Sequence, residues 1–186
     1  MRVIAGQFKG RRLKTPSWEG LRPTSDKLRE TLFNILAPRV EGARVLDGYA
    51  GTGALGIEAL SRGAADVTFV EANRRAAALI AENLKACGVE EGYTIQCADV
   101  VAALDARAAR PEPGRGAAFD LILLDPPYDT EHVSAVLDAA APHLARDGLL
   151  VLERATRREP GESPALVRVR DVKSGDSTLS LYRIRD

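Results

Sequence analysis

Four acidic residues follow apolar segments of this chain at the points where strands would end. They are Asp47, Glu71, Asp99 and Asp125. Parallel strands bring their carboxyl ends to one edge of a sheet, and open α/β sheets bind their ligands at that edge. Carboxylates accept hydrogen bonds from hydroxyl, amine and ammonium groups. Four acids at successive strand ends therefore predict a ligand site rather than a mere set of helix caps.

The stretch from Asp125 to Tyr128 is Asp-Pro-Pro-Tyr, directly after the apolar run 119–124. Each proline fixes φ at about −65°, so the carboxylate before Pro126 and Pro127 and the aromatic ring after them are held in one geometry. A rigid acid followed by a ring suits a flat substrate that carries an amine. Because paired prolines are also common in loops, a simple strand-ending turn is the alternative.

A glycine-rich segment follows Asp47 and opens a predicted helix. Gly51, Gly53 and Gly56 have the spacing of a dinucleotide-binding fingerprint, and Glu71 comes twenty residues after Gly51, where an acidic residue binds ribose hydroxyls. This motif alone does not separate NAD from S-adenosylmethionine. Asp47 favours the second, because its carboxylate repels a pyrophosphate but accepts hydrogen bonds from an ammonium group, directly or through water. We expect a cofactor with an ammonium group and an adenosine.

Asp99 follows the third predicted strand. Its carboxylate is placed to accept a hydrogen bond from the exocyclic amine of adenine, while the adjacent backbone contacts the edge of the ring. The alternative is an ordinary N-cap of the next helix, and one carboxylate can serve both purposes.

Predicted strands and helices alternate from residue 43 onward. This order is typical of a parallel sheet with right-handed crossovers. The last two apolar segments, 166–172 and 179–184, leave no room for a helix between them and predict an antiparallel hairpin at a sheet edge. The predicted fold is therefore α/β, with a seven-stranded, mostly parallel sheet. The expected strands are 44–47, 66–70, 93–97, 119–124 and 149–153, and the expected helices are 54–61, 74–86, 100–109 and 132–144.

Residues 1–39 are strongly basic. They contain nine Lys or Arg and three acidic residues, so they carry a net charge of +6 and the remainder of the chain carries −6. Lys and Arg neutralise phosphates, and we therefore interpret residues 1–39 as an RNA-binding extension before a domain at 40–186. A merely solvated basic face is the alternative. The candidate RNA-binding residues are Arg2, Lys9, Arg11, Arg12, Lys14 and Arg22.

Within the extension we expect a small basic hairpin over residues 2–14 and a helix over 27–36. Ser25 or Thr24 is available as the helix cap, and Pro38 is expected to close the helix.

Several classes of protein are disfavoured. No apolar run reaches membrane-spanning length, and the basic start carries no signal-peptide pattern, so we expect a cytoplasmic protein. Cys87 and Cys97 are isolated from each other and have no metal-ligand spacing. We predict no metal site.

Four blocks of the chain form one pattern: Arg22-Pro23-Thr24, Phe33-Asn34-Ile35-Leu36, the glycine-rich block 50–64 and Asp125-Pro126-Pro127-Tyr128. This pattern closely resembles the RsmD family of 16S ribosomal RNA guanine-N(2) methyltransferases. Gly48-Tyr49 and the Pro/Gly-containing segment 111–116 depart from that family's pattern. The resemblance implies a Rossmann-like class I fold that uses S-adenosylmethionine, no metal, and a substrate that is 16S rRNA or a partly assembled small ribosomal subunit. We expect a monomer.

The resemblance also implies which residues are catalytic and which bind the cofactor. Asp125 and the Pro126 carbonyl would accept the two hydrogens of a guanine amine and aim its lone pair at the methyl group, with Tyr128 stacked on the base. The expected catalytic residues are Asp125, Pro126, Pro127 and Tyr128, and the expected cofactor-binding residues are Thr24, Asp47, Tyr49, Ala50, Gly51, Thr52, Gly53, Glu71, Ala72, Asp99, Val100 and Asp125.

Other functions stay open at this point. A DNA amino-methyltransferase would use the same acid and ring on adenine or cytosine, although the chain has no sizeable target-recognition domain. A protein-glutamine methyltransferase usually has Asn in place of Asp125. An NAD oxidoreductase would explain the glycines and leave Asp125 unused. A noncatalytic ribosome-assembly protein would bind RNA without transferring a methyl group.

Overall fold

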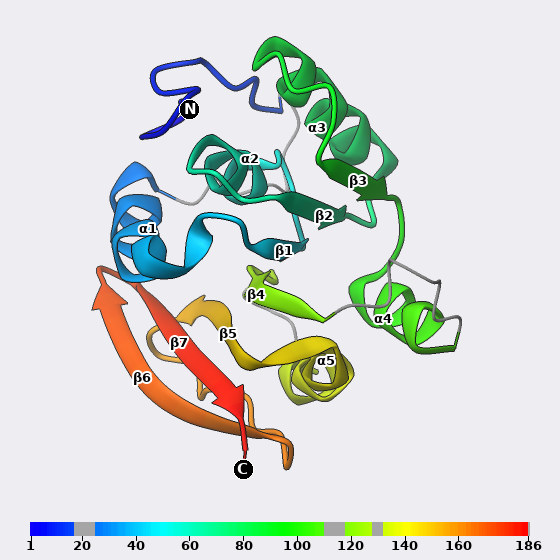
Figure 1. Ribbon diagram of the computed structural model, residues 1–186. Helices are drawn as coiled ribbons and strands as arrows, with labels where there is room; N and C mark the ends of the chain where they lie inside the picture. Colours follow the sequence, from blue (N-terminus) through cyan, green and yellow to red (C-terminus); the bar gives the residue numbers. More distant parts are fainter. Residues whose placement is uncertain (17–24, 110–117, 128–131, 186) are drawn as a thin grey trace.

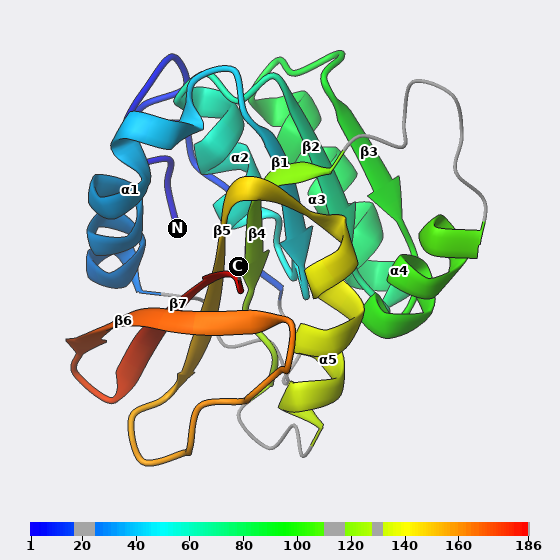
Figure 2. The same cartoon turned by 60° about the horizontal axis from the view of Figure 1, so that its bottom comes forward.

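The computed structural model describes residues 1–16, 25–109, 118–127 and 132–185. One central sheet is covered by helices on both faces (Figure 1). Helices α1, α2 and α3 cover one face, and α4 and α5 cover the other (Figure 2). The helices are α1 Asp26–Val40, α2 Ala54–Ser61, α3 Arg74–Ala86, α4 Val100–Ala109 and α5 Val133–Ala140, followed by the 3₁₀ turn η1 Ala141–His143.

The seven-stranded sheet confirms the predicted fold class. Its strand order is β3-β2-β1-β4-β5-β7-β6. The first five strands along the chain run parallel, while β7 runs antiparallel to both β5 and β6. The chain leaves β1 toward one edge and returns to β4 on its other side, so the crevice between β1 and β4 is where such a sheet binds a ligand. The strands are β1 Arg44–Gly48, β2 Asp66–Val70, β3 Tyr93–Gln96, β4 Phe119–Leu124, β5 Leu144–Ala155, β6 Leu166–Ser174 and β7 Ser177–Ile184.

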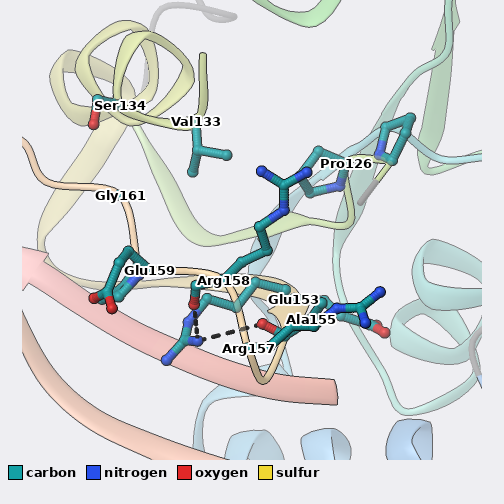
Figure 3. Close-up of a pocket in the computed structure, with 12 residues that line it drawn as sticks. Pro126, Val133, Ser134, Glu153, Ala155, Arg157, Arg158, Glu159 and Gly161 are labelled. Carbon is teal, nitrogen blue, oxygen red and sulfur yellow. Dashed lines mark hydrogen bonds between the residues drawn. The ribbon is translucent and has the colours of Figure 1, made fainter. Parts of the chain in front are cut away.

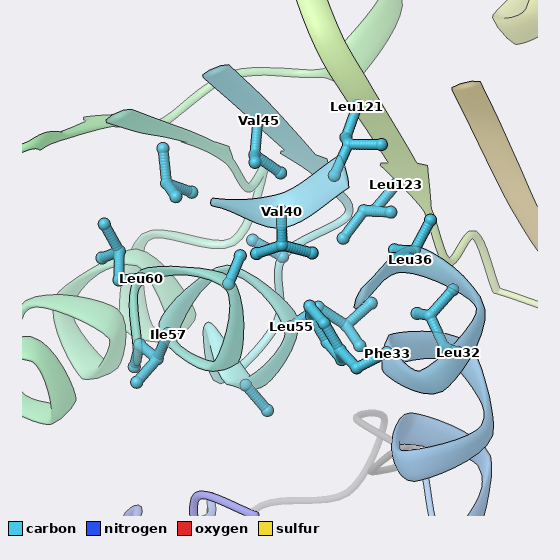
Figure 4. Close-up of a cluster of buried hydrophobic side chains, with 14 of the residues drawn as sticks. Leu32, Phe33, Leu36, Val40, Val45, Leu55, Ile57, Leu60, Leu121 and Leu123 are labelled. Carbon is cyan, nitrogen blue, oxygen red and sulfur yellow. The ribbon is translucent and has the colours of Figure 1, made fainter. Parts of the chain in front are cut away.

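Alternation along the strands sends apolar side chains to both faces. Val45, Leu121 and Leu123 point toward the face covered by α1 and α2, where they meet Phe33 and Leu36 of α1 (Figure 4). Neighbouring strand residues build the second cluster under α4 and α5. Helix α1 therefore packs into the same core as the sheet, and the division of the chain at residues 39 and 40 stays a prediction.

Several element boundaries differ from the sequence prediction, and strand β5 begins at Leu144 rather than at residue 149. Pro38 does not close α1, which continues to Val40; burial of the Val40 side chain stabilises a last turn in which proline removes only one hydrogen bond. The helix expected over 132–144 ends at Ala140, because Pro142 follows in a 3₁₀ turn and β5 begins at Leu144. No helix within the described residues is long and apolar enough to cross a membrane.

Candidate active site

Asp47 lies at the centre of the sheet's carboxyl edge, in β1, and is buried. Its Oδ2 accepts a hydrogen bond of 2.8 Å from the backbone N–H of Gly56, in the first turn of α2. Its Oδ1 is buried and has no hydrogen-bond partner among the described residues. Burial raises the pKa of Asp47 well above its usual range, the Gly56 bond opposes that rise, and the charges of Asp125 and Glu71 add to it. Three of the predicted acids therefore converge.

The loop between β1 and α2 needs its glycines for two different reasons. Gly53 has φ +77° at the N-cap of α2, a conformation that glycine adopts without strain. Gly56 has no room for a side chain, because an added Cβ would collide with the ring of Phe69 in β2. The missing side chain lets α2 lie close against the sheet, which places the Gly56 N–H within reach of Asp47.

Glu71 follows β2 and holds the same loop. Its Oε2 accepts from the backbone N–H of Gly51 at 2.8 Å, and its Oε1 accepts from that of Asn73 at 2.8 Å. The structure thus places Glu71 beside the glycine loop, as a ribose-binding residue requires. Each carboxylate oxygen retains acceptor capacity beyond these single bonds.

Asp99 is exposed and caps α4, since its Oδ1 accepts from the N–H of Ala102 at 3.1 Å. The helix-cap alternative is therefore confirmed, and a second role in adenine binding stays a prediction. Tyr49 lies near Asp99. Burial raises the pKa of Tyr49 to about 12, with the charge of Asp99 adding to the effect. Tyr49 also has φ +63°, which is uncommon outside glycine.

Asp125 follows β4 and is partly buried. Its backbone N–H donates to the carbonyl oxygen of Gly48 at 3.3 Å, so β1 and β4 stay joined as far as the predicted catalytic motif. Pro126 is buried and Pro127 is exposed. Of the other predicted site residues, Ala50 binds β2 through its N–H and Val100 begins α4, whereas Thr24, Arg22 and Tyr128 lie outside the described residues.

Hydrogen bonds hold the basic N-terminal segment, residues 1–14, against α2 and α3. Arg2 and Arg12 form an antiparallel bridge, which agrees with the predicted hairpin. The buried carboxylate of Glu58 accepts from the N–H groups of Ile4 and Ala5 at 2.7 and 3.0 Å. At the other end of the segment, Lys14 and Thr52 both bind Asn83.

The predicted RNA-binding residues differ in whether their side chains are bonded within the protein. Lys14 pairs with Glu82 at 2.8 Å, and Arg11 donates to the carbonyl oxygen of Ala86. All five described cations are exposed, namely Arg2, Lys9, Arg11, Arg12 and Lys14. Sequence reasoning missed the fastening residues Glu58 and Asn83, although a glutamate in an otherwise apolar helix could have indicated a buried acceptor.

A cavity of about 450 Å³ opens beside Pro126 and Pro127, between β5, α5 and the loop after β5 (Figure 3). Its lining includes Pro126 and Pro127 from the end of β4 and Arg157, Arg158 and Gly161 from the loop after β5. Sequence reasoning did not predict this cavity. The available signal was the cluster of arginines directly after the fifth predicted strand.

The comparisons with known proteins agree with this geometry. A family model described as "Conserved hypothetical protein 95" matches residues 1–183. The chain is 37% identical over the whole length of both chains to a Bacillus subtilis protein named "Putative rRNA methyltransferase YlbH". It is 42% identical to ribosomal RNA small subunit methyltransferase D of Haemophilus influenzae, over 69% of this chain and 64% of that protein, which is just under two thirds of the relative's length.

Solved structures resemble the whole chain. A structure from Escherichia coli titled "Putative methyltransferase yhhF" superposes with a TM-score of 0.84 and is 29% identical, covering 99% of this chain and 97% of that one. A second, a hypothetical protein from Thermus thermophilus, has a TM-score of 0.82 at 28% identity and covers 99% of both chains.

Proposed function

The chain belongs to the conserved hypothetical protein 95 family, which is the RsmD family, and we propose that it methylates small-subunit ribosomal RNA at the exocyclic N2 amine of a guanine. The observation that carries this proposal is the convergence of Asp47, Glu71 and Asp125 at the crevice between β1 and β4. The relatives named small subunit methyltransferase D support the class of substrate.

S-adenosylmethionine fits the site better than a dinucleotide does. The buried Oδ1 of Asp47 is an acceptor without a partner among the described residues, and a polar atom in that state is costly unless a ligand or water binds it. The three converging carboxylates repel a pyrophosphate and attract a cation. S-adenosylmethionine carries both an ammonium and a sulfonium group, and it supplies an electrophilic methyl group.

The residues that would hold this cofactor come from three strand ends. Asp47 would accept from the ammonium group, directly or through water. Glu71 would accept from the ribose hydroxyls while it keeps the glycine loop in place. Asp99 would accept from the adenine amine, with Tyr49 beside it. Each role uses a lone pair that the bonds within the protein leave available.

Asp125 and Pro126 are assigned to the substrate amine. The lone pair of an exocyclic amine is delocalised into the base, so the amine is a poor nucleophile. The Asp125 carboxylate and the Pro126 carbonyl would accept its two hydrogens and orient the lone pair, which is catalysis by positioning and placed acceptors. After transfer, Asp125 accepts the extra proton or passes it to water. Tyr128, the ring of the predicted stack, follows directly in the chain.

The substrate is 16S rRNA, alone or in a partly assembled small subunit, and the enzyme acts as a monomer in the cytoplasm. The exposed cations Arg2, Lys9 and Arg12 support an RNA partner. The choice of guanine rests on membership of the family, because an acid and a proline carbonyl would hold any planar amine.

The test uses the full chain with labelled S-adenosylmethionine and two substrates, transcribed 16S rRNA and small subunits reconstituted from it. We expect label in one guanine, identified by nucleoside mass spectrometry. Asp125→Asn should abolish transfer, binding of the donor is measured separately, and Asp138→Asn, an exposed acid on α5, is the matched control. Label in adenine or cytosine would contradict the N2 assignment, and no transfer to either RNA would contradict the function.

A further inference from the structure

The loop after β5 carries two arginines into the cavity beside the Asp-Pro-Pro motif. Arg157 and Arg158 are both exposed. Within the described part of the chain, neither guanidinium group has a hydrogen bond or an ion pair. Figure 3 shows the side chain of Arg158 extending toward Pro126. Two exposed cations therefore line the same cavity as Pro126, and the Arg158 side chain extends toward that proline.

A third arginine holds the first part of this loop in place. Arg154 donates to the carbonyl oxygen of Arg158 at 2.6 Å and to Ser180 Oγ at 2.9 Å, and it pairs with Asp171 at 3.2 Å. The guanidinium group of Arg154 is thus engaged by partners within the protein. Its hydrogen bonds fix the turn that presents Arg157 and Arg158.

The far end of the loop is fixed against α5. The carbonyl oxygen of Gly161 accepts from the hydroxyl of Tyr182 at 2.9 Å. A Cβ added to Gly161 would lie only 2.7 Å from a methyl group of Val133 and 2.9 Å from one of Leu137, so the backbone lies directly on the helix. Because both ends are held, little ordering is needed before the two arginines bind a ligand.

The cavity has the chemistry of a nucleotide-phosphate site. Guanidinium groups bind phosphate oxygens with paired donors, and Pro126 and Pro127 supply an apolar wall for a sugar or base. Two acids, Glu153 and Glu159, also line the cavity. Glu153 is buried, and Figure 3 shows Glu159 beside Gly161, on the opposite side from the Arg158 guanidinium. The volume of about 450 Å³ lies within the range of sites that hold ligands of nucleotide size.

We propose that Arg157 and Arg158 bind the RNA phosphodiester next to the target nucleotide and hold the backbone while the base lies at Asp125. This inference rests on the proposed function. The residues assigned to the cofactor lie at the ends of β1, β2 and β3, so the cavity beside β5 is left for the RNA. A base that is taken out of its stack must be held there, and phosphate contacts fix the register of the backbone without reading its sequence.

The experiment compares Arg157→Gln, Arg158→Gln and their combination with Arg146→Gln. Arg146 is also exposed and lies in the same strand region, but near the amino end of β5, away from the cavity. Methylation of transcribed 16S rRNA and of reconstituted small subunits is measured over a range of KCl concentrations. Binding of RNA to the enzyme saturated with S-adenosylhomocysteine is measured in parallel, so that the test does not depend on turnover.

The combined variant should raise the KM for RNA by roughly tenfold and lower the salt slope of binding by about one unit for each phosphate that is no longer neutralised. Its affinity for S-adenosylmethionine and its melting temperature should match those of the Arg146→Gln control. If the wild-type enzyme methylates the RNA and the combined variant has the same KM and salt slope, the phosphate site is overturned and the proposed function stays intact. A wild-type enzyme that transfers no methyl group, yet loses RNA binding on removal of the two arginines, would overturn the function and support the site.

Discussion

The carboxylate of Asp47, in β1, accepts a 2.8 Å hydrogen bond from the backbone N–H of Gly56, in the first turn of α2. Oδ2 of this buried side chain therefore joins β1 to the helix that follows the glycine loop. Oδ1 has no partner among the described residues. The same residue connects the local geometry of the loop to the charge of the ligand that the loop can accept.

Asp47→Asn should weaken the binding of S-adenosylmethionine. The substitution keeps the shape of the side chain but removes the negative charge that would face the ammonium group. A hydrogen bond to a charged group is worth about 1.5–3 kcal/mol, so the dissociation constant should rise by roughly tenfold or more. Titration calorimetry measures this directly. An affinity equal to that of the wild type would remove Asp47 from the cofactor site.

The titration of Asp47 should make the free energy of unfolding depend on pH. Burial raises its pKa well above the usual value, so at pH values between the unfolded and the folded pKa the ligand-free folded protein retains a proton that the unfolded chain releases. The stabilisation from this proton is complete below the unfolded pKa of about 3.9 and is lost as the pH rises through the folded pKa. The free energy of unfolding of the wild type should therefore fall relative to that of Asp47→Asn as the pH rises. Urea unfolding of both proteins checks this, and a constant difference would contradict it.

Gly56→Ala should destabilise the fold and disturb the cofactor loop together. The added methyl group collides with the ring of Phe69, and overpacking of this kind costs about 1–3 kcal/mol. Combining Gly56→Ala with Phe69→Leu should restore part of the stability, because the smaller side chain makes room. Denaturant unfolding of the single and double variants gives the coupling. Additive effects would show that the two residues do not compete for the same space.

Glu58→Ala should release the N-terminal segment from α2. The variant leaves the N–H groups of Ile4 and Ala5 and the guanidinium of Arg62 without their buried acceptor, and the loss of one partner of a buried charged pair costs about 3–5 kcal/mol. Hydrogen exchange over residues 1–14 should rise. Glu82→Ala removes only the exposed pair with Lys14, so it is the control and should change stability by about 1 kcal/mol at most. Equal protection of the segment in both variants would contradict this fastening.

The exposed cations of the N-terminal bridge should contribute to RNA affinity. Replacing Arg2 and Arg12 by Gln should weaken RNA binding and flatten its salt dependence by about one unit for each phosphate that the two side chains neutralise. Arg11→Gln should have a smaller effect, because Arg11 is bound to the carbonyl oxygen of Ala86. The measurement is RNA binding at several salt concentrations. An unaltered slope for the Arg2 and Arg12 variant would mean that this face is only solvated.

The sequence by itself determined the order and type of the main elements. The segments 54–61, 74–86 and 100–109 begin and end at the predicted residues, because their apolar content and flanking glycine, asparagine or aspartate residues act locally. The acids at the strand ends could also be placed on one edge from the sequence, because parallel strands bring their carboxyl ends to the same edge of the sheet.

Only the tertiary structure decided what each of these groups is bonded to. The long-range bonds from Glu58 to the N-terminus and from Glu71 to Gly51, the unpartnered oxygen of Asp47 among the described residues, and the cavity that joins Pro126 to Arg158 each depend on segments far apart in the chain. Burial of Val40 likewise carried α1 beyond Pro38. Sequence periodicity reports the face that a residue occupies, whereas hydrogen-bond partners, burial and pKa follow from how the faces pack.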